Sequence, residues 1–313
     1  MSDTFTELLH DSSKYLDLNQ LINVSLTSTS SIFAGLNNTK YNRFIPSDNR
    51  EKLLKLVKLT NKEMLKEIKA SSNVNLVDDV HSPVQHPDTL LILVVIHKNY
   101  EVVKSLINAG AHSHINTITY DKSTPIMWAS RKNKLDIVKL LIEEGANINV
   151  IEPKLSPLFC AIENDNYEIV ELLIEEGFNV NIVDNRKRTP LYIAILYNYF
   201  DIAELLIVKG EADVNISNDD GVFPLHMAVG GDNILLVKLI IENDGSSINN
   251  TTDEGRTPLF WAVDDNNFDM VELLINNGAD IHIADEKNGQ TPLSWAIKRN
   301  LNDIVELLKS QDN

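Results

Sequence analysis

The side chains of this sequence that could do chemistry are one cysteine, eight histidines and several adjacent carboxylates. Cys160 is the single cysteine, so it cannot form an internal disulfide, and we interpret it as a buried, inert thiol rather than a nucleophile. The histidines lack metal-ligand spacing, and His112 and His114 fall at an expected turn. No glycine-rich phosphate loop is present, because Gly230 and Gly231 stand alone.

Adjacent acidic residues are the remaining candidates for acid-base or metal chemistry. Glu143-Glu144 and Glu175-Glu176 each stand just before a glycine, where we expect solvated side chains. Asp264-Asp265 differs from these two pairs in position, because it falls at the end of an expected first helix and not before a closing glycine. The sequence predicts no catalytic residue, cofactor or metal site, and we expect a protein that is not an enzyme. An active centre in the first forty residues is the weakest alternative, since no cofactor motif occurs there.

The composition indicates which classes of partner and which cellular compartment to expect. The 313 residues include 45 acidic and 28 basic side chains, a formal charge of -17 that disfavours nucleic acid. With 43% hydrophobic and 23% charged residues, the chain should fold. The longest apolar run, Leu90–Ile96, is too short for a membrane span, and Met1–Glu7 does not read as a secretory signal. We therefore expect an intracellular, cytoplasmic protein without membrane insertion.

A repeat of 32 to 34 residues organises most of the chain. Each copy has a triplet resembling Thr-Pro-Leu, then a small residue, an apolar series and a closing glycine. Thr or Ser can accept from the free amides at a helix start, and Pro loses no hydrogen bond at the next position. The glycine can take the left-handed cap of a second helix. The triplets begin at Thr124, Ser156, Thr189, Phe223, Thr257 and Thr291, with a degenerate copy at Thr89.

This pattern is similar to the ankyrin repeat, whose signature includes Thr-Pro-Leu-His, Ile-Val-x-Leu-Leu and Gly-Ala-Asp-Val-Asn. Ala212–Asn215, Leu225-His226 and Gly278–Ile281 are close matches. The resemblance implies an all-α solenoid of stacked helix-turn-helix units with hairpin-like finger loops, and in the family His226 would hydrogen-bond between loops. It also implies a protein partner along the concave face formed by the first helices and the fingers.

The resemblance divides the chain into four regions. Residues 1–36 form a helical segment, 37–50 a linker, 51–82 a degenerate capping repeat with a long loop, and 83–313 the array. We expect the first helices of the repeats to start near 89, 124, 156, 189, 223, 257 and 291.

The N-terminal segment resembles the start of an F-box, because Glu7-Leu8-Leu9, Tyr15-Leu16-Asp17, Leu21 and Leu26-Thr27-Ser28 follow that family's spacing. Phe5-Thr6 and the absence of a basic residue at Thr27–Thr29 depart from it. The resemblance implies docking on the adaptor subunit of a cullin-type ubiquitin ligase, with the array holding a substrate. The alternative is that these helices only cover the end of the solenoid. The adaptor-contacting residues would be Leu8, Leu9, Leu16, Leu18, Leu21 and Ile22.

Carried onto this sequence, the family's partner surface consists of exposed residues on the fingers and at the ends of the first helices. Tyr120, Leu196 and Tyr197 would be its anchors, whereas we expect Trp128, Trp261 and Trp295 to pack inside. The finger set is Tyr120, Asp121, Asn185, Arg186, Arg188, Asp219, Asp253, Glu254, Arg256, Lys287 and Asn288. The helix-end set is Arg131, Lys132, Glu163, Asn164, Leu196, Tyr197, Asp264, Asp265, Lys298 and Arg299.

The charges on this surface alternate along the array. Basic residues occur in the early repeats, an acidic stretch runs from Asp219 to Asp265, and Lys298-Arg299 follows. We expect a monomeric scaffold that binds a protein ligand of mixed charge. Beside the ubiquitin-ligase receptor, a plain scaffold and a host-directed decoy in an infected cell remain open as alternatives.

Overall fold

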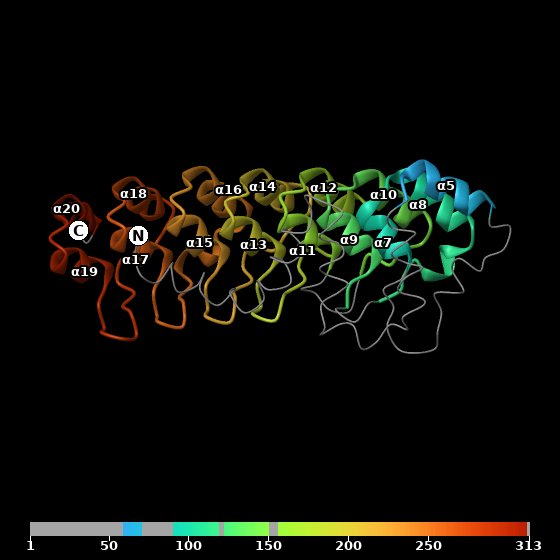
Figure 1. Ribbon diagram of the computed structural model, residues 1–313. Helices are drawn as coiled ribbons and strands as arrows, with labels where there is room; N and C mark the ends of the chain where they lie inside the picture. Colours follow the sequence, from blue (N-terminus) through green and yellow to red (C-terminus); the bar gives the residue numbers. More distant parts are fainter. Residues whose placement is uncertain (1–58, 71–89, 119–121, 150–155, 312–313) are drawn as a thin grey trace. The chain divides into compact units, whose positions relative to one another are not determined.

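The computed structural model describes residues 59–70, 90–118, 122–149 and 156–311 of the chain. It consists of two compact units, Met1–Asp121 and Lys122–Asn313. Across the described ranges every regular element is a helix (Figure 1). The all-α repeat fold predicted from the sequence is therefore confirmed.

In the first unit, the described residues form three α-helices and one short 3-10 helix. These are α5 (Asn61–Ala70), α7 (Leu90–His97), α8 (Tyr100–Asn108) and η3 (Ala111–His114). Helix α8 packs against both α5 and α7. Asn99 accepts a hydrogen bond from the Val102 amide at the start of α8. The Lys98 ammonium group donates to the Leu59 carbonyl, which links the start of α5 to the turn before α8.

The second unit consists of helix pairs stacked side by side. Its first helices form one row, its second helices form another, and the finger loops project from the first-helix side (Figure 1). The first helices are α9 (Pro125–Arg131), α11 (Pro157–Ile162), α13 (Pro190–Leu196), α15 (Pro224–Gly230), α17 (Pro258–Asp264) and α19 (Pro292–Lys298). The second helices are α10 (Leu135–Glu143), α12 (Tyr167–Glu175), α14 (Phe200–Val208), α16 (Ile234–Asp244), α18 (Phe268–Asn276) and α20 (Asn302–Gln311), and η5 (Gly245–Asn249) follows α16.

The triplets start the first helices as predicted, with two differences in how the first turn is capped. The hydroxyls of Ser156, Thr189, Thr257 and Thr291 accept from the amide three residues on, at 3.1–3.2 Å. The Thr124 hydroxyl has no hydrogen-bond partner in the described part of the chain. Phe223 has no hydroxyl, and the imidazole of His226 accepts from its amide instead.

Short polar residues make the turn between the two helices of each pair. They have φ between 51° and 60°, in the left-handed region that Asn and Asp tolerate better than most residues. The polar residue thus lets the chain reverse within two or three residues, so the second helix packs directly on the first. These residues are Asn133, Asp165, Asn198, Asp232, Asn266 and Asn300.

The closing glycines take the expected left-handed cap at Gly110, Gly145, Gly177 and Gly278, where φ is between 76° and 117°. The prediction is wrong at Gly210 and at Gly245, whose φ is -74°. The stretch from Gly210 to Asn215 is one residue longer than that from Gly177 to Asn181, and Glu211 takes the left-handed position with φ 52°. Helix α16 extends to Asp244 before η5 begins, so it ends without a left-handed glycine.

A continuous core separates the two rows of helices. The small residue of each first helix, such as Ala161 or Ala194, is fully buried and lets its second helix approach closely. Leucine and isoleucine side chains from the second helices, among them Leu173 and Leu206, fill the space between neighbouring pairs. Cys160 is 1% exposed, as its repeat position predicts.

Candidate functional site

The fingers that lie wholly within the described residues are tight loops, each built around one buried polar side chain. Asp184 accepts from the amides of Arg186 and Arg188 at 2.8 and 2.9 Å, and the backbone of the loop closes from the Asp184 amide to the Arg188 carbonyl. Asn218 does the same for the amides of Asp220 and Val222, at 3.0 and 2.8 Å. Asp and Asn favour such turns because their side chains reach their own backbone.

The same construction recurs, with variations, in the last two fingers. Thr252 holds its finger more weakly, through a 3.4 Å contact with the Arg256 amide. Asp285 accepts from the amides of Asn288 and Gln290. Burial by itself would raise the pKa of Asp285, but these amide donors, Gln290 first, outweigh it and leave the pKa below its ordinary value. A buried carboxylate therefore organises this finger in its charged form.

Neighbouring fingers are joined by backbone hydrogen bonds. The Asp219 amide donates to the Arg186 carbonyl, the Asp253 amide to the Asp220 carbonyl, and the Glu286 amide to the Glu254 carbonyl, at 2.9–3.0 Å. At Gly255 an added Cβ would lie 2.5 Å from the Glu286 amide nitrogen. The loops are thus held in register, and their side chains are positioned before any partner arrives.

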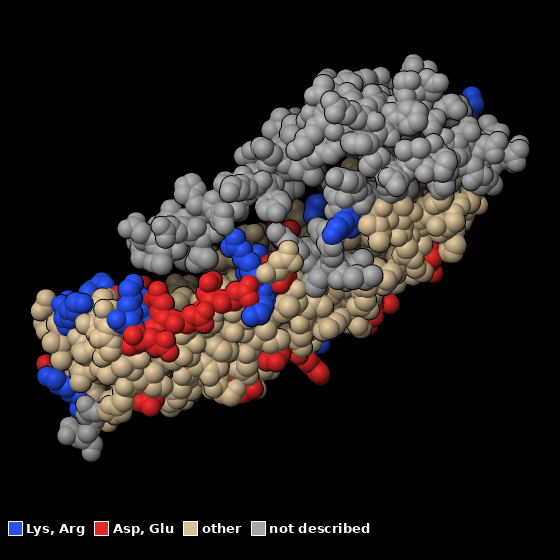
Figure 2. All heavy atoms as spheres, turned by 90° about the horizontal axis from the view of Figure 1, so that it is seen from below, with Lys and Arg blue, Asp and Glu red and all other residues tan. Residues whose placement is uncertain are grey.

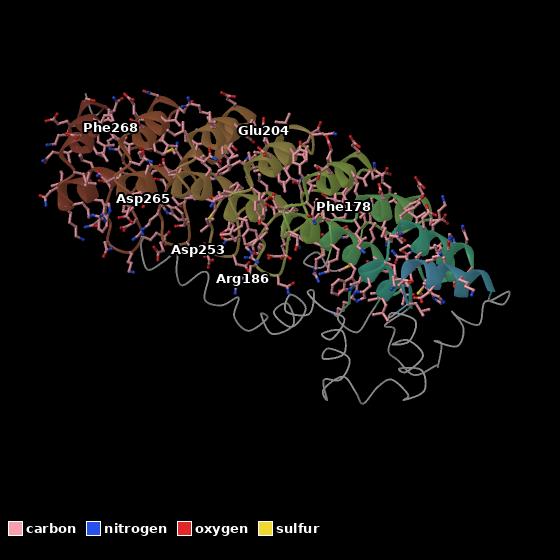
Figure 3. All side chains as sticks on the ribbon, turned by 45° about the horizontal axis from the view of Figure 1, so that its top comes forward. Phe178, Arg186, Glu204, Asp253, Asp265 and Phe268 are labelled. Carbon is pink, nitrogen blue, oxygen red and sulfur yellow. The ribbon has the colours of Figure 1, made fainter. Side chains whose placement is uncertain are left out.

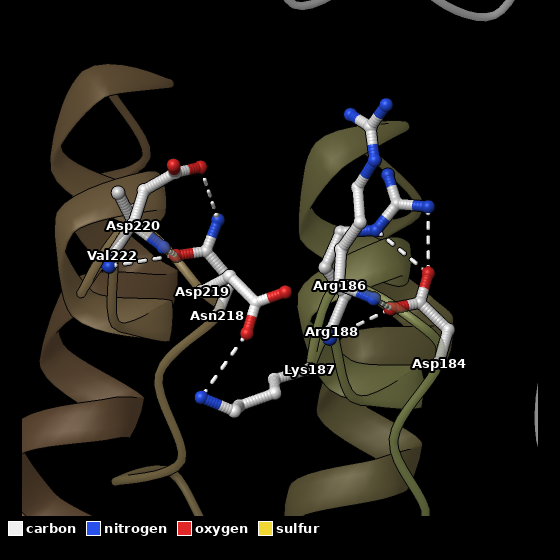
Figure 4. A network of polar contacts seen from close by, with 8 residues as sticks. All are labelled: Asp184, Arg186, Lys187, Arg188, Asn218, Asp219, Asp220 and Val222. Atoms are coloured by element: carbon white, nitrogen blue, oxygen red, sulfur yellow. Dashed lines mark hydrogen bonds and ion pairs between the residues drawn. The ribbon is translucent and has the colours of Figure 1, made fainter.

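A network of charged side chains covers two of these fingers (Figure 4). Arg188 pairs with one oxygen of Asp184 through Nε and Nη2, at 2.8 and 2.7 Å. Lys187 reaches across to the carboxylate of Asp219 in the next finger, at 3.1 Å. The side chain of Arg186, which stands between Asp184 and Lys187 in the sequence, is exposed. The exposed tips therefore carry charge on a rigid support.

Acidic side chains form a row over the fingers that follow, with basic side chains beside it (Figure 2). Arg186 and Lys187 precede the row, and Lys287 lies next to its last member in sequence. All of these residues are exposed. The acidic row consists of Asp219, Asp220, Asp253, Glu254 and Glu286.

The finger residues predicted from the sequence are brought together on one side of the second unit, where Arg186 and Asp253 lie away from Glu204 and Phe268 of the second helices (Figure 3). Asn185, Arg186, Asp219, Asp253, Glu254, Lys287 and Asn288 are exposed as expected.

Two of the finger arginines are not exposed, which corrects the prediction. The side chain of Arg188 is 23% exposed because Asp184 holds it, and that of Arg256 is 26% exposed because it lies 5.2 Å over the Phe260 ring. Arg256 also approaches Glu254 at 3.4 Å. Tyr120 and Asp121 lie outside the described residues, as do the F-box-like positions Leu8, Leu9, Leu16, Leu18, Leu21 and Ile22.

The ends of the first helices add a second group of predicted residues. Tyr197 is 45% exposed and lies 5.7 Å from the ring of Tyr199, while Leu196 is half-buried. Burial, ahead of the neighbouring Glu163, raises the pKa of Tyr197. Glu163 and Asn164 are exposed. Tyr197 is therefore available as an aromatic anchor, whereas Leu196 is less accessible than predicted.

Asp264 connects the last two first helices. One of its oxygens accepts from the Trp295 indole nitrogen at 2.9 Å and from Arg299 at 2.8 Å. Lys298 lies 4.6 Å over the Trp295 ring. Burial and then the Asp264 charge raise the pKa of Asp265. Asp264 is therefore used for structure, and Asp265, Lys298 and Arg299 remain exposed.

The tryptophans and basic residues of the other first helices follow a similar arrangement. Arg131 stacks 5.1 Å over the Trp128 ring, and both Arg131 and Lys132 are half-buried. Burial, then the Arg131 charge, lowers the pKa of Lys132. Trp128 is 8% exposed, which confirms its predicted packing role, whereas Trp261 and Trp295 are only partly covered.

His226 joins two repeats. One ring nitrogen donates to the Arg256 carbonyl at 3.0 Å, and the other accepts from the Phe223 amide at 3.3 Å. Its side chain is fully buried, which lowers its pKa to about 4. The loop-to-loop role implied by the resemblance is confirmed, and the imidazole is neutral at neutral pH.

Sequence reasoning missed four residues of the fingers and helix ends, of which three are exposed and Tyr199 is half-buried. Asp220 stands 34 residues before Glu254, so the repeat spacing would have found it. Glu286 precedes the predicted Lys287 and needed the same comparison. Lys187 has a left-handed φ of 55° and stands between the predicted Arg186 and Arg188, so its neighbours in the sequence could have indicated it. Tyr199 stands at the N-cap position of α14 without a side-chain capping hydrogen bond, and nothing in the sequence indicated it.

Over the ranges described, no group of His, Cys, Asp and Glu side chains could hold a metal ion. No helix there is long and apolar enough to cross a membrane.

The comparisons with known proteins agree with this architecture. A family model described as Ankyrin repeats (3 copies) matches residues 53–152, 151–218, 207–285 and 225–313. The chain therefore belongs to the ankyrin repeat family, whose members generally act as non-enzymatic interaction modules, and the match indicates no catalytic family.

Two individual proteins illustrate this similarity. The ankyrin repeat protein FPV031 of Fowlpox virus (strain NVSL) is 35% identical over 134 residues, which cover 42% of this chain and 39% of that protein's length. The solved complex of the Bd0816 predatory endopeptidase from Bdellovibrio bacteriovorus with the immunity protein Bd3460 contains a chain that is 28% identical, with a TM-score of 0.52. That match covers 59% of this chain and 96% of the other.

Proposed function

We propose that the second unit is a scaffold that binds a partner protein along its fingers and the ends of its first helices. The observation that carries this proposal is the row of acidic side chains, flanked by basic ones, on fingers already locked by hydrogen bonds (Figure 2). A preorganised loop loses little conformational entropy on binding. The charge pattern suits a partner surface with basic residues at its centre and acidic residues at its edges.

Affinity capture from cell extract tests this proposal. The bait is the full chain, compared with an Asp219→Asn, Asp253→Asn and Glu254→Gln variant whose finger backbones keep their hydrogen bonds. The control variant carries Glu168→Gln, Glu204→Gln and Glu272→Gln, exposed positions on α12, α14 and α18. We expect quantitative mass spectrometry to show proteins lost from the finger variant but retained by the control. Equal capture by both variants would refute the proposed face.

A narrower proposal concerns residues 1–36. The F-box-like spacing of Glu7 to Ser28 supports a substrate receptor in which this segment recruits the adaptor of a cullin ubiquitin ligase. In the alternative, the segment caps the array and the chain is a plain scaffold or a host-directed decoy. Both versions place the protein inside a cell. Capture with and without Met1–Asn38 separates them, because adaptor subunits should appear only with the full chain in the receptor version.

A further inference from the structure

A pocket of about 510 Å³ lies on the second-helix side, between the ends of α14 and α16. Ile207, Val208 and Leu239 contribute apolar surface to it. Val208 is 63% exposed, so its side chain is accessible at the edge of the pocket. The pocket shares no residue with the fingers or with the ends of the first helices.

Carboxylates surround this apolar surface. Glu211, Asp213, Glu242 and Asp244 all line the pocket and are exposed. The Ser246 backbone amide, ahead of its side chain, lowers the pKa of Asp244, so this carboxyl stays charged. Lys and Arg are absent from the lining. The pocket thus combines an apolar wall with uncompensated negative charge.

In the preceding groove, between α12 and α14, a lysine of the chain itself neutralises the carboxylates. The ammonium group of Lys209, the residue directly after α14, reaches back to α12 and pairs with Glu171 at 2.9 Å and Glu175 at 2.6 Å. One lysine therefore neutralises two carboxylates and lies across the groove.

The groove between α14 and α16 lacks this lysine. Counted from the residue before each second helix, Asn243 takes the place of Lys209, while Glu204 and Val208 take the places of Glu171 and Glu175. The Asn243 side chain is an uncharged amide and cannot neutralise a carboxylate. The position that supplies a cation one repeat earlier is therefore uncharged here, and the carboxylates that line the pocket, which stand at other positions, have no lysine or arginine beside them in the lining.

The loops beside the pocket also lack a hydrogen bond found elsewhere. The Asn181 side chain accepts from the Asp213 amide at 2.9 Å, and that of Asn249 accepts from the Asp280 amide at 2.7 Å. At the equivalent Asn215, the oxygen is shielded from solvent and has no hydrogen-bond partner among the residues described. Its amide group donates to Asp244 at 2.6 Å instead. The two loops are thus joined through the Asp244 side chain rather than through a backbone amide, and both Asn215 and Asp244 line the pocket.

We propose that this pocket binds a lysine side chain of a partner protein, with an apolar neighbour of that lysine against Val208 and Leu239. The partner's ammonium group would do here what Lys209 does in the preceding groove, and the carboxylates complement its charge. The site is separate from the finger surface, so a partner can engage it whether or not the fingers are occupied.

NMR titration of the ¹⁵N-labelled full chain with acetyl-Leu-Lys-Leu-amide tests this proposal. The matched probe is the same peptide with an Nε-acetylated lysine, which has similar shape but no charge. We expect saturable shifts of the amides of Glu211, Asn215 and Asn243 with the lysine peptide, and about fivefold weaker binding of the acetylated one, since surface ion pairs each contribute little. Equal shifts with both peptides, or none, would overturn it.

Asn243→Lys supplies a second test, because it should place a lysine of the chain itself across the groove. We expect this variant to bind the lysine peptide no better than wild type binds the acetylated peptide. Asn276→Lys adds the same charge on α18, at an exposed position one repeat away, and should bind like wild type. Unchanged binding by Asn243→Lys would contradict the proposed occupant.

Discussion

Replacing the glycine at a finger tip tests whether the fingers support one another. Gly255 and Gly289 both have a left-handed φ, 76° and 60°, so alanine is strained at either position. They differ in what surrounds them. A Cβ at Gly255 would lie 2.5 Å from the amide nitrogen and 2.7 Å from Cγ of Glu286 in the next finger, whereas a Cβ at Gly289 meets nothing within 4 Å.

The two substitutions should therefore differ by the steric term alone. The left-handed conformation costs alanine about 1–2 kcal/mol, of which a part is offset because alanine restricts the unfolded chain. We expect Gly289→Ala to lower the free energy of unfolding by about 1 kcal/mol on these grounds. Gly255→Ala adds a clash with the Glu286 backbone, and overpacking of this kind lowers the free energy of unfolding by about 1–3 kcal/mol more.

Urea denaturation followed by circular dichroism measures the difference, and hydrogen exchange locates it. The amide of Glu286, which donates to the Glu254 carbonyl at 2.9 Å, should exchange faster in Gly255→Ala but not in Gly289→Ala. Equal destabilisation by both substitutions, with equal exchange at Glu286, would refute the idea that neighbouring fingers are packed in register.

Three further predictions follow from single side chains. Burial lowers the pKa of His226 from 6.5 to about 4, so as the pH falls the unfolded state binds a proton at this residue before the folded state does. The free energy of unfolding should therefore fall by about 3 kcal/mol as the pH drops from 6.5 to 4. Urea melts between pH 7 and 4.5 should show this slope in wild type and not in His226→Gln. Asp184→Asn should lower the free energy of unfolding by about 1 kcal/mol, because it loses the Arg188 ion pair but keeps a side chain that can hold the turn, as Asn218 does in the next finger. Asp184→Ala also loses the turn's hydrogen bonds and should lower it by about 2–3 kcal/mol. Equal losses for the two variants in urea denaturation would contradict this. Tyr197→Ala should leave the melting temperature within about 2 °C of wild type, since the ring is 45% exposed, while reducing partner capture; a large drop in stability would mean that the ring is structural.

Most of the fold could be predicted from the repeat spacing, because the residues that start and end the helices act through local interactions. A Thr-Pro pair caps a helix wherever it occurs, so Thr189 and Thr257 could be interpreted without knowing their neighbours. The exceptions arise where the length of the repeat changes. One extra residue after Gly210 shifts the left-handed position to Glu211, and a period search tolerant of such insertions does not reveal the shift.

The candidate site was only partly predictable, because exposure depends on contacts between repeats. Arg188 and Arg256 occupy the same place in their fingers, but one meets Asp184 and the other lies over Phe260. Asp264 was expected on the surface, yet it accepts from Trp295 and Arg299 of the following helix. The pairing between fingers follows from the register of the stacked loops, which a single sequence does not encode locally.

Site-specific photo-crosslinking in cells tests the central claim most directly. A photoreactive amino acid is placed at Asp219 or Asp253 on the fingers, and in matched chains at Glu204 or Glu272 on the second helices, all exposed positions. If the fingers hold the partner, the two finger positions should crosslink to the same protein and the two second-helix positions should not capture it. Capture of that protein from Glu204 or Glu272 alone would contradict the assignment of the binding face.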